Sequence, residues 1–217
     1  MFEEFPKIAR LTRECVVTEK IDGTNAQVHI RPVTAEDYED TSPLAVAHDT
    51  KAGLLMFAGS RSRYLTTQPG SKGDNFGFAA WVTAHADELF ALGEGRHYGE
   101  WWGSGIQRGY GLSKGERRFS LFNVARWADN RDREKYPQDR PVCCHVVPVL
   151  YRGAFDTFLI DGLIEHMRLH GSLAAPGFMK PEGIVVWHEA ARQLFKKTLE
   201  KDEEGKEQRA RKLAHTT

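Results

Sequence analysis

The stretch Glu19-Lys20-Ile21-Asp22-Gly23-Thr24-Asn25 sets a lysine, an acid and a glycine between two apolar segments. Residues 15–18 are short and rich in β-branched side chains, and residues 26–30 alternate with period two, so the stretch is predicted to join two strands or to cap one. Gly23 allows a tight turn and a close approach of a ligand to the backbone. A lysine there is a nucleophile where its surroundings favour the neutral amine. A hairpin with a surface lysine explains this short pattern equally well.

Five further segments decide between the two interpretations. They are GSRSR (59–63), YGEWWGSGIQRGYG (98–111), FSLFNV (119–124), PEGIVV (181–186) and LFKKTLE (194–200). Together with the lysine stretch, and in this order, they resemble the covalent nucleotidyltransferases, and among these the ATP-dependent RNA ligases of the small bacteriophage type, which implies a role in RNA repair. The segments span most of the chain, so the resemblance is specific.

The resemblance implies an α+β fold in which antiparallel sheets and flanking helices form a nucleotidyltransferase (ligase) catalytic domain. A chain of 217 residues suits one sizeable core. We therefore expect one catalytic domain over residues 1–200, a charged tail over residues 201–217 and no C-terminal oligonucleotide-binding barrel. Apolar spacing predicts a helix over residues 75–92, capped by Asp74 or Asn75 and ended by Gly93. It also predicts a core helix over residues 154–169 that includes Phe158 and ends before Gly171, and a strand buried on both faces over residues 142–150. Residues 31–50 lack periodicity and are predicted to form a surface loop.

Composition narrows the functional class. The formal net charge is zero and the pI is about 7.1, so any nucleic-acid surface is a local patch and binding is expected to be weak and salt-dependent. The sequence has no apolar run of membrane-spanning length and no signal peptide, which predicts a cytoplasmic protein without membrane contact. The three cysteines fit neither a disulfide framework nor a paired zinc motif. We expect a monomer with reduced thiols.

The resemblance implies a site for ATP. Lys20 is expected to attack the α-phosphorus, and Glu100 to accept hydrogen bonds from the ribose hydroxyls. Glu100 is also the one acid among aromatic residues, and a buried carboxylate is costly unless it is paired, so we expect it to have a polar partner. A ring in the predicted strand around residues 118–127 is expected to stack on adenine. Alternation puts Phe119 and Phe122 on opposite faces, and core packing explains either ring. The resemblance favours Phe122, because the family usually has Phe-Asp where this chain has Phe122-Asn123. Further nucleotide contacts are expected from Glu19, Ile21 and Asn25.

Basic side chains are expected to contact phosphates. Arg61 and Arg63 are predicted to lie on the same face of an extended segment, where guanidinium groups bond phosphate oxygens in pairs. The family pattern Lys-x-Lys is replaced here by Lys196-Lys197, so the two ammonium groups are predicted on opposite faces. Both are candidates for binding the nucleotide, and Lys196 is the preferred catalytic one.

Two further elements are implied by the resemblance. Glu182, at the mouth of a β-branched strand, is expected to be catalytic and to bind Mg²⁺ directly or through water. The glycine-rich residues 103–111 are expected to form a mobile loop, from which Arg108 and Tyr110 meet phosphate or base.

The expected activity is ATP-dependent joining of a 5′-phosphate end to a 3′-hydroxyl end of RNA through a lysyl-adenylate. Three alternatives remain: a DNA-nick ligase, an adenylyltransferase acting on another acceptor, and an inactive nucleotide-binding module. Asp22 is shared with DNA ligases, whereas many similar RNA ligases have histidine there. Asn25 lies in the Gly-Thr-Asn context of RNA-joining members, which favours RNA over DNA.

Overall fold

The computed structural model describes residue 5 and residues 7–39, 44–67, 73–128 and 139–200. The chain divides into two compact units. The first unit comprises Met1–Ile21 and Pro148–Thr217, and the second comprises Asp22–Val147. The predicted catalytic domain over residues 1–200 stays a prediction, and the predicted tail lies outside the described residues.

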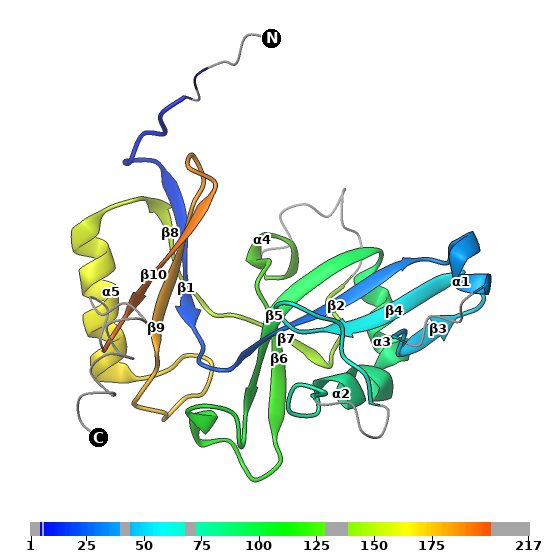
Figure 1. The fold of residues 1–217 in the computed structure, drawn as a ribbon. Coiled ribbons are helices and arrows are strands. Elements are labelled where there is room, and N and C mark those ends of the chain that lie inside the picture. Colours follow the sequence, from blue (N-terminus) through cyan, green and yellow to red (C-terminus); the bar gives the residue numbers. More distant parts are fainter. Residues whose placement is uncertain (1–4, 6, 40–43, 68–72, 129–138, 201–217) are drawn as a thin grey trace, which may run out of the picture. The chain divides into compact units, whose positions relative to one another are not determined.

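The first unit contains a four-stranded antiparallel sheet in the order β10-β9-β1-β8 (Figure 1). Its elements are β1 (Glu14–Lys20), β8 (Val149–Ala154), α5 (Thr157–His170), β9 (Gly183–His188) and β10 (Gln193–Thr198). Alternation along β1 buries Cys15 and Val17, which share a core with Ile160, Ile164 and Met167 of α5. Helix α5 therefore covers one face of this sheet.

The predicted helix over residues 154–169 is confirmed with a later start. The Asp156 side chain accepts hydrogen bonds from the backbone N–H groups of Phe158 and Leu159, so it caps the helix before Thr157. The predicted end before Gly171 is correct. Phe158, expected in the core, is exposed, because it lies in the first turn, and Ile160 occupies the core instead.

The second unit contains a six-stranded sheet in the order β3-β4-β2-β5-β6-β7, antiparallel except for β6 and β7. The strands are β2 (Thr24–Pro32), β3 (Ala47–Asp49), β4 (Leu54–Gly59), β5 (Gly95–Gly103), β6 (Arg117–Leu121) and β7 (Cys144–Val146). The helical segments are α1 (Ala35–Glu39), α2 (Phe78–Ala84), α3 (Ala86–Leu89), α4 (Val124–Trp127), η1 (Phe90–Leu92) and η2 (Gly109–Gly111). Antiparallel sheets with flanking helices agree with the predicted α+β class.

The two faces of β2 differ in character. Ala26, Val28 and Ile30 are buried in a core that includes Phe78 and Val82 of α2. The intervening side chains form what we call the polar face of the sheet; on β2 they are Asn25, Gln27, His29 and Arg31. The predicted nucleotide-binding residue Asn25 therefore lies on the polar face.

The predicted helix over residues 75–92 is wrong as a single element. It consists of α2, α3 and η1, because Asn75, Phe76 and Gly77 have positive φ and His85, at φ −112°, interrupts the helical backbone. Asp74 does stabilise the start, since its carboxylate accepts from the Gly77 N–H at 2.7 Å. Gly93 ends the segment as predicted, with φ 75°.

The strand predicted over residues 142–150 is also wrong as one element. It is β7 and β8, which belong to different units, and Val142 is 90% exposed. Pro148 lies between them and lacks the N–H that a continuous ladder needs. The predicted loop over residues 31–50 contains α1 and β3, and its residues 40–43 lie outside the described part. No helix in the described part of the chain is long and apolar enough to span a membrane.

The buried His97 predicts acid-sensitive stability. Its Nε2 lies 2.9 Å from the Gly93 carbonyl oxygen, and burial, followed by the charge of Arg126, lowers the pKa of His97 to about 4. The unfolded chain takes up this proton first, so stability is full above about pH 6.5 and is lost as pH falls towards 4, by up to about 3 kcal/mol. Urea unfolding of His97→Gln should lose this part of the pH dependence.

The exposed His166 offers a matched control, because it lies outside the core on α5. His166→Gln should retain the pH dependence of the wild-type protein. An unchanged pH profile in His97→Gln would contradict the assignment to His97.

Candidate functional site

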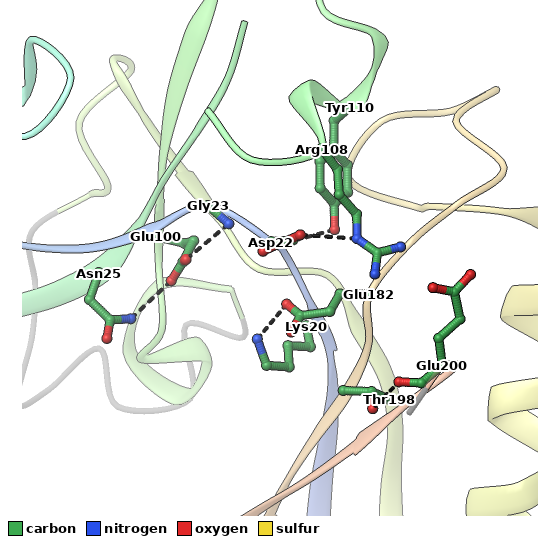
Figure 2. Close-up of polar contacts among 10 residues, drawn as sticks. All are labelled: Lys20, Asp22, Gly23, Asn25, Glu100, Arg108, Tyr110, Glu182, Thr198 and Glu200. Atoms are coloured by element: carbon green, nitrogen blue, oxygen red, sulfur yellow. Dashed lines mark hydrogen bonds and ion pairs between the residues drawn. The ribbon is translucent and has the colours of Figure 1, made fainter. Parts of the chain in front are cut away.

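The predicted nucleophile and the predicted metal ligand meet in the first unit. Lys20 is the last residue of β1 and pairs with Gly183, the first residue of β9. Glu182, which immediately precedes β9, forms an ion pair with the Lys20 ammonium (Figure 2). Both side chains remain about one fifth exposed, at 24% and 19%. The fold therefore brings together Lys20 and Glu182, two of the residues that are predicted to be catalytic.

The strand end beside Glu182 has room only for glycine. A β-carbon on Gly183 would lie 2.2 Å from the backbone oxygen of Lys197, and φ is +154°. A side chain here would push β10 away from β9. Gly183 therefore fixes the distance between the Glu182 strand and the strand that carries Lys196.

The two lysines of β10 lie on opposite faces, as predicted. Lys196 pairs with Val185, and Val185 with Thr18, so Lys196 shares the face of Lys20. Lys197 lies on the α5 face, where its Nζ is 2.5 Å from a carboxylate oxygen of Asp161. Lys196 thus lies on the same face as Lys20, whereas Lys197 is paired with Asp161 of the helix.

Glu19 faces away from Lys20 and supports a loop. Its buried carboxylate accepts from Ser172 Oγ at 2.5 Å and from the backbone N–H groups of Leu173 and Ala174, each at 2.9 Å. Burial raises the pKa of Glu19, and the hydrogen bonds offset this only in part. The nucleotide contacts expected of Glu19 and of Ile21, whose side chain is also buried, stay predictions.

In the second unit, the Glu100 carboxylate is held in place by two donors. Register pairs Asn25 on β2 with Glu100 on β5, and Asn25 Nδ2 donates to one carboxylate oxygen at 3.1 Å. The Gly23 N–H donates to the other oxygen, also at 3.1 Å (Figure 2). The Asn25 side-chain oxygen accepts from Arg61 Nε at 2.7 Å. A polar partner for the buried Glu100 is thereby confirmed, and three predicted residues form one network.

Gly23 is required by crowding against β5. A β-carbon at this position would lie 2.4 Å from the Trp101 carbonyl oxygen and 2.7 Å from the Trp102 β-carbon. The absence of a side chain is what lets the Gly23 N–H reach Glu100. The predicted turn at Gly23 thus orients the Glu100 carboxylate on β5.

The two candidate rings have different environments. Phe119 pairs with Trp101 on the core face and is fully buried, with its ring centroid 5.1 Å from that of Phe78. Ser120 pairs with Glu100, and Phe122 continues that side of the ladder with its N–H on the Tyr98 carbonyl at 2.9 Å. Phe122 is 42% exposed. Only Phe122 has a free ring surface on the Glu100 side, and its stacking on adenine stays a prediction.

An ion pair that sequence reasoning missed ties the glycine-rich loop to the lysine stretch. Arg108 Nε donates to an Asp22 carboxylate oxygen at 3.0 Å, and the Asp22 N–H donates to the Tyr110 hydroxyl at 2.9 Å. Tyr110 is buried against the Trp102 ring, so the expectation that Tyr110 meets phosphate or base is wrong. The opposite charges of Asp22 and Arg108 are compatible with an ion pair. Because the two residues are 86 positions apart, no local sequence pattern indicates that they meet.

The arginine segment is a turn rather than an extended strand end. The Ser60 N–H donates to the Arg63 carbonyl at 2.8 Å, which reverses the chain after β4. Arg61 consequently reaches Asn25, while the guanidinium of Arg63 lies against Gly73. The prediction that Arg61 and Arg63 share one face of an extended segment is therefore wrong.

A divalent metal fits this donor set only with help from a substrate. Within the described residues, no three His, Cys, Asp or Glu side chains gather closely enough to hold a metal ion. Mg²⁺ in nucleotide sites uses one or two carboxylates together with substrate phosphates and water. Glu182, a partly exposed carboxylate at a strand end, suits that mode of binding.

Substitution of the two rings separates core packing from ligand binding. Phe119→Ala should lower the free energy of unfolding by about 3–5 kcal/mol, because it empties a buried site. Phe122→Ala should cost less than about 1 kcal/mol in stability, since the ring is partly exposed, and should weaken ATP binding. Urea denaturation and ATP titration of both variants measure the two effects. Unchanged ATP affinity in Phe122→Ala would exclude stacking by this ring.

Comparison with solved structures gives matches to the RNA ligase of Naegleria gruberi. A ligand-free variant of that ligase is 19% identical, with a TM-score of 0.53, over 87% of this chain and 50% of the ligase. A variant with ATP and manganese is 19% identical, with a TM-score of 0.52, over 88% of this chain and 52% of the ligase. A variant with AMP and manganese is 18% identical, with a TM-score of 0.53, over 87% and 50%.

These matches show a shared fold, and the present chain spans about half the length of the ligase structures. A search of curated protein sequences finds no match. The family model described as RNA ligase, however, matches residues 13–201. That match covers most of the 217 residues and includes every segment named above, and on this ground the chain belongs to the RNA ligase family.

Proposed function

We propose that this chain catalyses ATP-dependent joining of RNA ends. The observation that carries the proposal is the ion pair of Lys20 and Glu182 at the aligned ends of β1 and β9, in a chain of the RNA ligase family. Solved structures of the Naegleria gruberi ligase with ATP or AMP and manganese support an adenine nucleotide and a divalent metal as its ligands.

In the proposed first step, the Lys20 amine attacks the α-phosphorus of ATP. A nitrogen–phosphorus bond forms, the bond to the bridging oxygen breaks, and pyrophosphate leaves. The attacking species is the neutral amine, so the proton that Lys20 directs at Glu182 passes to water before the nitrogen–phosphorus bond forms. The cationic Lys196, on the same face of the sheet, opposes the negative charge that spreads over the phosphoryl oxygens.

Residues of the polar face are assigned to the nucleoside. Glu100 accepts from the ribose hydroxyls, since an ionised carboxylate oxygen takes more than one hydrogen bond. Asn25 and Gly23 keep Glu100 in position, and Arg61 keeps Asn25 in position. The exposed ring of Phe122 offers a surface for adenine.

Magnesium is proposed as the divalent metal. Glu182 would hold it together with the ATP phosphates, and the ion would supply charge neutralisation at the phosphoryl group. After adenylylation, AMP passes from Lys20 to a 5′-phosphate end, and a 3′-hydroxyl displaces AMP to form the phosphodiester bond. We place this activity in RNA repair by a cytoplasmic monomer, in line with the small phage ligases that the sequence resembles.

Covalent labelling tests the first step. Lys20→Ala should abolish transfer of radiolabel from α-labelled ATP to the protein, because the nucleophile is lost. Denaturing gel electrophoresis detects the label, and circular dichroism checks the fold. Lys51→Ala, which changes an exposed lysine in the turn before β4, should label like the wild-type protein. Persistent labelling of Lys20→Ala would move the nucleophile elsewhere, and failure of the wild-type protein to label would reject the proposal.

The sugars at the junction test the substrate class. Sealing should be faster when the end that supplies the 3′-hydroxyl is RNA, because a 2′-hydroxyl offers a donor and an acceptor that a polar site can use. Nicked duplexes and single strands that differ only in the junction sugars provide the comparison. Equal or faster sealing of an all-DNA nick would replace RNA by DNA as the substrate and leave the lysyl-adenylate chemistry unaffected.

A further inference from the structure

The polar face continues beyond the Asn25–Glu100 network to residues that have no part in the proposed reaction. On β2, Gln27 and His29 follow Asn25 on this face. Register pairs Gln27 with Tyr98, and His29 with Arg96, both on β5. Arg96, Tyr98 and Glu100 are therefore consecutive side chains on one face of β5, about 7 Å apart along the strand. Glu100 and Tyr98, the latter beside Phe122, adjoin the residues assigned to ATP, and Arg96 lies beyond them on the same face.

The side chains around Arg96 form a connected network of hydrogen bonds. Arg96 donates to Gln27 Oε1 at 3.0 Å and to the Tyr64 hydroxyl at 3.1 Å. The Tyr64 hydroxyl lies 2.6 Å from His29 Nδ1, and the two rings are stacked with a centroid separation of 5.9 Å. Gln27 in turn donates to the Ser60 carbonyl at 2.9 Å. An exposed arginine is thus held in one orientation by neutral acceptors.

The charge of Arg96 is not compensated within the described residues, where no carboxylate lies within ion-pair distance of its guanidinium. Arg31, on the same face, differs sharply, because Asp37 accepts from both of its terminal nitrogens at 2.7 Å. Arg61 contacts the amide oxygen of Asn25. The network therefore offers positive charge to a ligand that approaches this face.

His29 adds a second donor in one of its two tautomers. The Tyr64 hydroxyl, which accepts from Arg96, donates to His29 Nδ1 in the tautomer that carries the ring hydrogen on Nε2. Burial, together with the charges of Arg96 and Arg31, lowers the pKa of His29 and keeps the ring neutral at neutral pH. A neutral N–H beside a guanidinium that uses only some of its five hydrogens is a donor set for phosphate oxygens.

We infer that Arg96 and His29, which Tyr64 orients, bind a backbone phosphate of the RNA strand, and that Tyr98 stacks on a neighbouring base. Tyr98 is 53% exposed and lies between Arg96 and Glu100 on β5, so its ring is available to a base. The spacing of about 7 Å along the strand is close to the length of one nucleotide in an extended chain. This inference rests on the proposed function.

Distance along the strands of the second unit favours RNA over a single nucleotide as the ligand. Glu100, assigned to the ribose of ATP, pairs with Asn25, and Arg96 pairs with His29. Four residues along a strand, from Asn25 to His29, span about 13 Å. A ligand that contacts both Glu100 and Arg96 therefore needs more than one nucleotide, and a polynucleotide meets that need.

Binding of a 5′-phosphorylated 20-mer RNA by Arg96→Ala tests the inference. Its dissociation constant should rise at least about fivefold, and the slope of log affinity against log salt should fall by about 0.7, the value for one phosphate contact to a single strand. Arg96→Lys should recover part of the salt slope but less of the affinity, because it lacks the planar fork. Arg168→Ala, which changes an exposed arginine on α5, should bind RNA like the wild-type protein.

Tyr98→Ala separates stacking from charge. It should weaken RNA binding at least about fivefold with an unchanged salt slope, since a ring contact releases no counterion. ATP labelling of Lys20 should be unchanged in both Arg96→Ala and Tyr98→Ala, while transfer of AMP to the RNA end falls.

Four results would contradict the phosphate site or the proposed function. Wild-type affinity and salt slope in Arg96→Ala, or no RNA binding by the wild-type protein, would overturn the phosphate site. Loss of ATP labelling in a folded Arg96→Ala would assign the network to ATP and would also overturn it. If the wild-type protein does not label with ATP, the proposed function fails, and the binding comparison still decides the phosphate site because it needs no adenylylation.

Discussion

The pairing of β1 with β9 is the constraint on which the placement of Lys20 and Glu182 depends. It sets Lys20 opposite Gly183, and this register alone brings Glu182 to the ammonium. A shift of one residue would turn Lys20 to the helical face and Glu19 to the open one. The buried bonds between Glu19 and the loop after α5 oppose such a shift, because they would be broken without replacement. The buried bonds of Glu19 and the ion pair of Lys20 therefore require the same strand register.

Residues in local patterns were predictable from the sequence. Alternation placed Lys196 and Lys197 on opposite faces, and it separated Phe119 from Phe122. The lone acid among aromatics, Glu100, was expected to have a polar partner and has one. These predictions succeed because a strand has a fixed period of two and because a buried charge must be satisfied.

The errors concern features that local patterns do not encode. The broken helix after Asn75 depends on three consecutive residues with positive φ, two of which are not glycine. The burial of Tyr110 and its bond to Asp22 join segments 88 residues apart. The turn at Arg61 follows from one backbone hydrogen bond between Ser60 and Arg63. Tyr110 is placed by a long-range contact, whereas the positive φ values and the turn at Arg61 are backbone conformations that residue type alone does not determine. The sequence pattern therefore leaves all three open.

The ion pair of Lys20 also bears on what the protein does not react with. Cells contain many small electrophiles, such as aldehydes and activated carbonyl compounds, that modify exposed neutral amines. At neutral pH an ordinary lysine is already an ammonium without a lone pair, and the ion pair with Glu182 gives that form a fixed partner. Such electrophiles therefore meet a protonated side chain at the end of β1 rather than a free amine.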